Sequence, residues 1–303
     1  MANPQDKTDL QRAISASRQA FLFILLFSLF INLLMLAPSI YMLQVYDRVI
    51  TTRSPETLLM LTLVVVFLFV VMGALDLVRS RILVRVGNRL DMQINERLYQ
   101  ATFKRALLVP GRPSAQPFND LTTLRQFLSG NGLFAFFDAP WIPVYIAILT
   151  LFHPWFGIFA AVAASVLLVL AWINEKSTQS LLSEANREHI QSQDLAQSNL
   201  RNAEVLQAMG MLPNLLARWR GKHHDYLLHQ SHASDRAGTL SNVSKTLRIL
   251  FQSLILGLGA FLVIEGSLTG GMMIAGSILM GRALAPIDQM IGGWKGFIAA
   301  RTA

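Results

Sequence analysis

The sequence predicts an all-α membrane protein with six transmembrane helices. Of its 303 residues, 53% are hydrophobic and only 15% are charged, a balance that is unusual for a soluble domain. The apolar residues fall in long runs separated by charged stretches, and several runs approach the roughly 20 residues that cross a bilayer. The chain has no cysteine, which excludes a disulfide scaffold and a cysteine nucleophile.

The predicted spans follow one another with loops of very unequal length. They are residues 21–41, 58–74, 133–152, 155–173, 249–264 and 272–285. The first run is interrupted only by Asn32 and Pro38, and the second is almost pure hydrocarbon. Only His153 and Pro154 separate the third and fourth runs, so these two are expected to form a tight pair. The fifth and sixth runs are shorter and richer in Gly and Ala, and we predict a second pair.

The distribution of positive charge predicts the orientation. With six spans, all of the 26 Lys and Arg residues except Arg48 and Arg53 fall on one side. Since cytoplasmic loops carry the excess of cations, both termini are predicted to be cytoplasmic, in a bacterial inner membrane. This rule accounts for most of the net charge of +8. We therefore expect no nucleic-acid partner, because no aromatic residues alternate with the basic ones.

The first long polar segment, residues 76–132, is predicted to be a cytoplasmic helical hairpin. Ile82, Val86 and Leu90 continue the second span at helical spacing. Three prolines within residues 110–117 then interrupt the helix, and a helical pattern resumes after them.

The second long polar segment, residues 174–246, repeats this plan. Its first part, up to Leu212, favours helix and is free of proline, and Pro213 and Gly221 mark the turning region. Two long hairpins are thus predicted below the six spans. Such hairpins usually pass force or a signal to a partner, although solvated stalks without a partner were an open alternative.

Four stretches of the sequence together resemble a known family. They are APSIYMLQVYDRVITTRSPETLLMLT (37–62), FFDAPWIPVYIAILTLFHPWFG (136–157), RNAEVLQAMGM (201–211) and GGMMIAGSILMGRALAPIDQMIGGWKGF (270–297). They resemble the transmembrane domain of ABC exporters, and more specifically the permease/ATPase subunit of bacterial type I protein secretion systems. The resemblance runs through essentially the whole chain, in the order of the family.

This resemblance implies a homodimer of six-helix domains whose hairpin tips carry coupling helices seated on nucleotide-binding domains. The implied coupling residues are Ser114, Gln116, Phe118 and Asn119 in the first hairpin, and Asn202, Glu204, Val205, Ala208, Met209 and Gly210 in the second. It also implies a periplasmic adaptor (membrane fusion protein), an outer-membrane channel and contact with membrane lipid. The implied cargo is an exported protein that is taken up unfolded and carries a C-terminal signal.

The chain departs from this family in lacking the ATPase motif. The phosphate-cradling pattern G-x-x-x-x-G-K-[ST] does not occur in the 303 residues. ATP and Mg²⁺ are therefore expected in a nucleotide-binding domain that is truncated here or separately encoded. The chain itself is predicted to hold no cofactor and no catalytic residue.

Five ionisable residues lie in or beside the predicted spans. Asp138 is predicted to cap a helix or pair with a cation from another span, and the alternative is direct contact with cargo. Arg282 is predicted to line the pathway or to reach lipid phosphate. Asp47, Arg48 and Arg53 form a possible periplasmic docking site, or simply a solvated loop.

Two other functions are compatible with the sequence. A membrane scaffold or signal transducer is the first alternative, and a small-molecule ABC exporter is the second. Four histidines between positions 223 and 232 suggest a metal site, but no carboxylate stands at a metal-ligand spacing from them. We therefore expect no metal.

Overall fold

The computed structural model describes residues 18–108, 116–130 and 132–302, and none of these residues is in a β-strand. Six helices are long and apolar enough to cross a membrane, as the sequence predicts. The elements in chain order are α2 (Arg18–Leu34), α3 (Ala37–Gln44), the π-helical turn η2 (Val45–Val49), α4 (Ile50–Thr52), α5 (Pro55–Leu108), α6 (Gln116–Ser129), α7 (Gly132–Asp138), the 3-10 turn η3 (Ala139–Trp141), α8 (Ile142–Phe152), α9 (Pro154–Arg201), α10 (Ala203–Ala208), α11 (Leu212–Ile264) and α12 (Gly270–Thr302).

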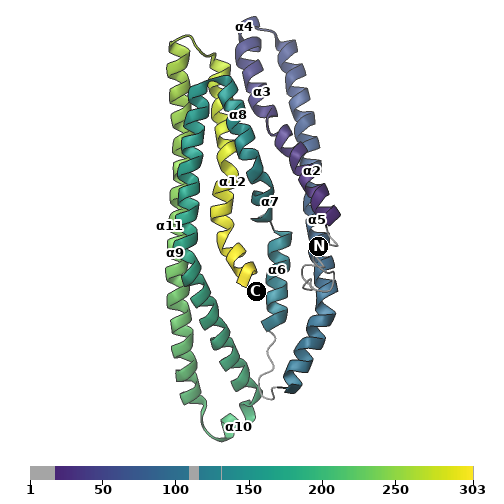
Figure 1. Ribbon diagram of the computed structural model, residues 1–303, viewed down its shortest axis with the longest axis vertical. Helices are drawn as coiled ribbons and strands as arrows, with labels where there is room; N and C mark the ends of the chain where they lie inside the picture. The colour runs from purple at the N-terminus through teal and green to yellow at the C-terminus, as the bar shows by residue number, and fades with distance from the viewer. Residues whose placement is uncertain (1–17, 109–115, 131, 303) are drawn as a thin grey trace, which may run out of the picture.

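The molecule has two distinct ends (Figure 1). At one end, which we call the short-loop end, α4 turns into α5, α8 turns into α9, and α11 turns into α12. At the opposite end, which we call the hairpin end, α5, α9 and α11 extend beyond the other spans, and α9 and α11 are joined through α10. This is the second hairpin, and the first hairpin is formed by the lower part of α5 with α6.

The helices are longer than the apolar runs that predicted them. The first run ends near residue 41, but the helical backbone continues through η2 to Thr52 and ends only where Arg53 adopts a left-handed conformation, at φ 53°. An apolar run ends where the chain leaves the hydrocarbon of the bilayer. A helix can continue beyond that point until its backbone conformation changes. Pro38 does break the first span, because it lacks an N–H and displaces the carbonyl four residues earlier. Helix α2 accordingly ends at Leu34.

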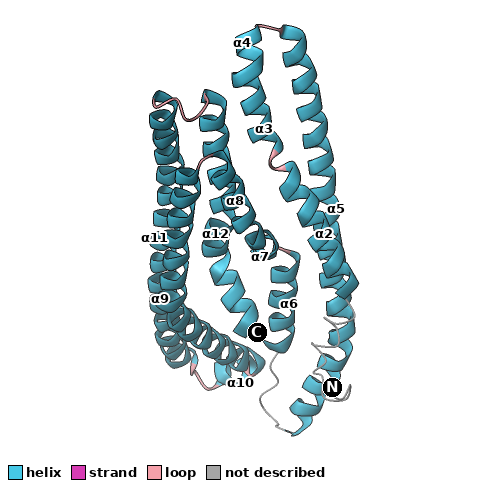
Figure 2. Cartoon of the chain, turned by 45° about the horizontal axis from the view of Figure 1, so that its top comes forward, coloured by secondary structure: helices cyan, strands magenta, loops and turns pink. Residues whose placement is uncertain are grey.

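The main apolar core belongs to the last four spans. Buried residues of α8, α9, α11 and α12, together with Leu268, form one cluster that includes Phe156, Leu167 and Met280. Within the described residues, only Leu36 of the first two spans lies against this cluster. Figure 2 shows the α2–α5 pair standing to one side of α8, α9, α11 and α12. The first two spans must therefore be attached mainly by other contacts.

Candidate functional site: a buried polar cluster and the hairpin tips

A charged cluster lies between the first two spans and α7. Arg79 of α5 is only 4% exposed. Its guanidinium donates hydrogen bonds to Asp138 at the end of α7, over 3.3 Å, and to Asp76 of its own helix, over 2.9 Å. It also lies over the ring of Phe134, 4.0 Å from the centroid. Because a buried cation is costly unless it is paired, these contacts decide how α5 and α7 meet.

Helices α2 and α8 join this cluster through hydrogen bonds. Asn32 of α2 donates to the Asp138 carboxylate over 2.9 Å and accepts from the Tyr145 hydroxyl of α8 over 3.0 Å. The Arg79 guanidinium donates to the Ser28 hydroxyl of α2 over 2.9 Å. We call Ser28, Asn32, Arg79, Asp138 and Tyr145 the inner polar cluster. It connects α2, α5, α7 and α8.

Asp138 makes a tertiary ion pair, and its side chain forms no hydrogen bond that caps the following turn. Its partner, Arg79, was not singled out from the sequence. A signal was present, because Arg79, Leu83, Val86 and Leu90 share one helical face and all are buried. A cation on the buried face of a long helix indicates a partner on another element.

Arg282 lies on α12 beside the break in the first span. Its guanidinium Nη1 is 4.0 Å from the sulfur of Met35. Pro286, inside the same helix, cannot donate to the carbonyl of Arg282. The half-buried Arg282 therefore stands where α12 is locally loosened.

The three charged residues of the short-loop end have different surroundings. The Asp47 carboxylate is turned toward α12 and accepts hydrogen bonds from Thr269 and from the backbone of Gly271. Arg48 and Arg53 are exposed. The two arginines are thus available to a partner, whereas the carboxylate is engaged within the chain.

The tip of the second hairpin is a short exposed helix. Val205 is 60% exposed and Met209 is 65% exposed, and Asn202, Glu204 and Ala208 are also exposed. Gly210 ends α10 in a left-handed conformation, at φ 63°. The N–H groups of Gly210 and Met211 bond back to Gln207 and Leu206, which is the usual glycine-terminated helix end. The tip therefore presents apolar side chains that no described residue covers.

One ring contact joins the two arms of the first hairpin near its turn: the Phe118 ring of α6 lies 6.4 Å from the Tyr99 ring of α5. Within α6, Gln116 donates to the Asp120 carboxylate over 2.7 Å. Asn119 is exposed, and Ser114 lies outside the described residues. Burial raises the pKa of Asp120, and the hydrogen bond from Gln116 opposes that shift.

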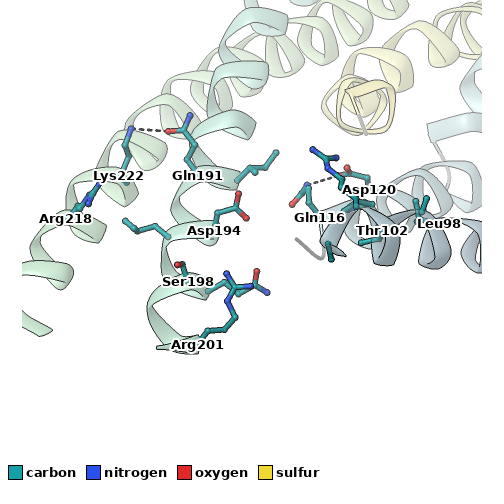
Figure 3. A pocket seen from close by; sticks show the side chains of 17 residues that line it. Leu98, Thr102, Gln116, Asp120, Gln191, Asp194, Ser198, Arg201, Arg218 and Lys222 are labelled. Carbon is teal, nitrogen blue, oxygen red and sulfur yellow. Dashed lines mark hydrogen bonds between the residues drawn. The ribbon is translucent and has the colours of Figure 1, made fainter. Parts of the chain in front are cut away.

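A cavity of about 1040 Å³ lies between the two hairpins (Figure 3). It is lined by α5 and α6 on one side and by α9 and α11 on the other. Its charged lining residues are Arg105, Asp120, Asp194, Arg201, Arg218 and Lys222. Lys222 reaches Glu188 over 3.4 Å and Gln191 over 3.2 Å. Sequence reasoning did not predict this cavity, because its walls are contributed by hairpins that are distant in sequence.

Two of the histidines lie against aromatic rings. His223 stacks on Trp219 at 4.7 Å between ring centroids, and His189 lies 4.7 Å from Tyr226. In the part of the chain that the structure describes, no group of three or more His, Asp or Glu side chains is placed to hold a metal ion.

Six spans with two long helical hairpins define the class of this protein: a polytopic α-helical transmembrane domain. The family of ABC transporter transmembrane regions matches residues 21–284. The chain belongs to this family.

Two relatives show which ABC transporters this chain is similar to. The chain is 39% identical over 294 residues to the type I secretion system ATP-binding protein PrsD of Rhizobium meliloti (strain 1021), covering 97% of this chain and 50% of the relative. It is 24% identical over 300 residues to the toxin RTX-I translocation ATP-binding protein of Actinobacillus pleuropneumoniae, covering 94% of this chain and 41% of the relative. The chain thus spans about half the length of these relatives or less.

A solved structure shows the same fold. A bacterial Atm1-family ABC exporter with ATP bound superposes with a TM-score of 0.76 at 15% identity, over 95% of this chain and 52% of the other. This likeness confirms the six-helix exporter fold that the sequence predicts. At this identity it concerns the fold alone.

Proposed function

We propose that this chain is the membrane half of an ATP-driven exporter in a type I protein secretion system. It would form the pathway for an unfolded polypeptide that carries a C-terminal signal. The similarity to PrsD, which extends over 97% of the chain, supports this class of exporter. The toxin translocation protein among the relatives supports a polypeptide as cargo.

The observation that carries the proposal is the uncovered tip of the second hairpin. Exposed Val205 and Met209 beside Glu204 suit a groove on a nucleotide-binding domain, where ATP and Mg²⁺ would be bound. Gln116, Phe118 and Asn119 would form the corresponding contact of the first hairpin. ATP binding supplies the energy in that domain, and the residues of this chain transmit its closure to the bundle.

We propose that the hairpin end faces the cytoplasm of a bacterial cell, with the spans in the inner membrane; the excess of cations at that end supports this orientation. We further propose a homodimer. The exposed Arg48 and Arg53 would face a periplasmic adaptor that leads to an outer-membrane channel. The inner polar cluster around Asp138 would act in gating, and Arg282 would line the pathway beside the loosened part of α12.

The test is a binding assay between this chain in detergent and the nucleotide-binding domain of its own exporter. We expect the domain to be retained by the native chain and lost on Glu204→Lys, which reverses the charge at the tip. Glu184→Lys is the matched control, since Glu184 is exposed on the same hairpin but lies within α9, away from the tip.

Retention that is unaffected by Glu204→Lys would refute the docking role of α10. If the chain retains no nucleotide-binding domain at all, the exporter proposal fails and a scaffold role replaces it. The cargo is tested separately, in the complete transporter. Its ATPase activity should respond to the C-terminal segment of a co-encoded protein, and a response only to small molecules would refute protein export.

A further inference from the structure

Hydrogen bonds join the first two spans to the last four at two heights, and α3 also packs along α12. Near the hairpin end the attachment is the inner polar cluster around Asp138. At the short-loop end it is the contact of Asp47 with the start of α12. The main apolar core contains only residues of the last four spans and Leu268. These hydrogen bonds therefore act together with the packing of α3 along α12, at the edge of that core.

The contact at the short-loop end is made by both oxygens of one carboxylate. The Thr269 hydroxyl donates to Asp47 Oδ2 over 2.6 Å, and the Gly271 N–H donates to Asp47 Oδ1 over 2.9 Å. The same Thr269 oxygen accepts from the N–H of Met272 over 3.2 Å. The carboxylate of the first span thus satisfies a free N–H group of the first turn of α12, where negative charge is favoured. We call Asp47, Thr269 and Gly271 the Asp47 clasp.

The surrounding backbone is shaped to admit this carboxylate. A Cβ atom placed on Gly271 would lie 2.7 Å from the carboxylate carbon of Asp47, so only glycine leaves room for the contact. A Cβ placed on the neighbouring Gly270 would meet nothing within 4 Å. Asp47 itself lies in the π-helical turn η2, an irregularity that inserts a residue into a helix and is frequent at functional sites.

We propose that the Asp47 clasp is a reversible latch that closes the short-loop end of the bundle. Its release would let α2, α3 and α5 move away from α12 at that end, while the inner polar cluster keeps them attached lower down. Each interhelical hydrogen bond in a membrane protein shifts an equilibrium by about threefold, and by about twentyfold at most. Two such bonds together favour the closed state by about tenfold. This bias is small enough for the clasp to open reversibly. The inference does not depend on the identity of the cargo.

The test uses the absence of cysteine from the chain. Ser39 of α3 is 2% exposed, and its buried hydroxyl has no hydrogen-bond partner among the described residues. Ser39→Cys is therefore a mild change that places a thiol on α3, which packs along α12. We measure the rate at which a maleimide labels this thiol in the chain reconstituted in lipid nanodiscs. Asp47→Ala should raise that rate about tenfold, because both bonds of the clasp are lost.

Gly271→Ala should have the same effect as Asp47→Ala, because its methyl group displaces the carboxylate. Gly270→Ala and Arg48→Ala are the matched controls and should leave the rate unchanged. A second reporter, Ala163→Cys, lies in the main core on α9 with 0% exposure and should stay protected in every background. The latch is refuted if the Ser39→Cys rate does not rise in the clasp variants. It is equally refuted if the labelling rate of Ala163→Cys rises together with that of Ser39→Cys, since that result means that the whole bundle has loosened.

Discussion

Arg79 and Asp138 lie 59 positions apart in the chain, and Arg79 Nη1 is 3.3 Å from Asp138 Oδ1. The pair joins the second span to the entry of the third, with side chains that are 5% and 14% exposed. Asn32 contacts the same carboxylate oxygen, so three segments converge on one charge. A buried charge of this kind fixes the arrangement of helices, because any displacement leaves it without a partner.

The first prediction concerns this ion pair. Arg79→Met removes the cation and leaves Asp138 buried, so the free energy of unfolding should fall by about 3–5 kcal/mol. Arg79→Met combined with Asp138→Leu should recover most of that loss, because no buried charge then remains unpaired and the Asp76 carboxylate is exposed. The measurement is unfolding of the chain in mixed micelles. Arg81→Met is the control on the exposed side of the same helix, and a loss equal to that of this control would contradict the pairing.

The second prediction concerns the hydrogen bond between Tyr145 and Asn32. The Tyr145 side chain is 1% exposed, and its hydroxyl also donates to the Asn32 carbonyl over 3.1 Å. In a double-mutant cycle, Tyr145→Phe and Asn32→Leu should show a coupling energy of about 0.6–1.7 kcal/mol, the range for interhelical hydrogen bonds in membranes. Additive effects of the two changes would show that this contact contributes nothing.

The third prediction concerns the packing of α9 against α12. A Cβ added at Gly276 would overlap the ring of Phe156 and lie 2.9 Å from its Cδ2 atom. Phe156 is fully buried and has no room to move, so Gly276→Ala should cost about 1–3 kcal/mol of stability. Gly257→Ala on α11 is the control, since nothing lies within 4 Å of an added methyl group there. Equal melting temperatures for the two variants would contradict this packing.

The fourth prediction concerns the effect of pH on the first hairpin. Burial raises the pKa of Asp120 above 3.8, so the folded chain binds this proton more tightly than the unfolded chain. Stability must therefore fall as the pH rises from 3.8 through the raised pKa, and the loss is complete above it. Asp120→Asn keeps an acceptor for Gln116 and removes the charge. The variant should melt higher than the native chain at neutral pH and equally below pH 3.8, and a difference confined to acid would contradict this assignment.

The second hairpin tip shows how much of the candidate site could be predicted. The resemblance placed coupling residues at 202–210, and the structure has an exposed short helix there that ends at Gly210. A glycine after a short helical stretch is a local signal. Whether a nucleotide-binding domain docks on this helix stays a prediction.

Hydropathy and helical spacing predict the six spans and the two long hairpins, and four stretches of sequence predict the family, because these signals act between neighbours in the chain. Which side chains meet across the bundle is known only from the fold. Asp47 contacts Gly271 across 224 positions, and the cavity between the hairpins takes its walls from four helices. The physical reason is that a helix fixes which of its residues share a face, but not which other helix that face meets. That choice depends on the packing of the whole bundle, in which the buried Arg79 is stable only when it is paired with Asp138.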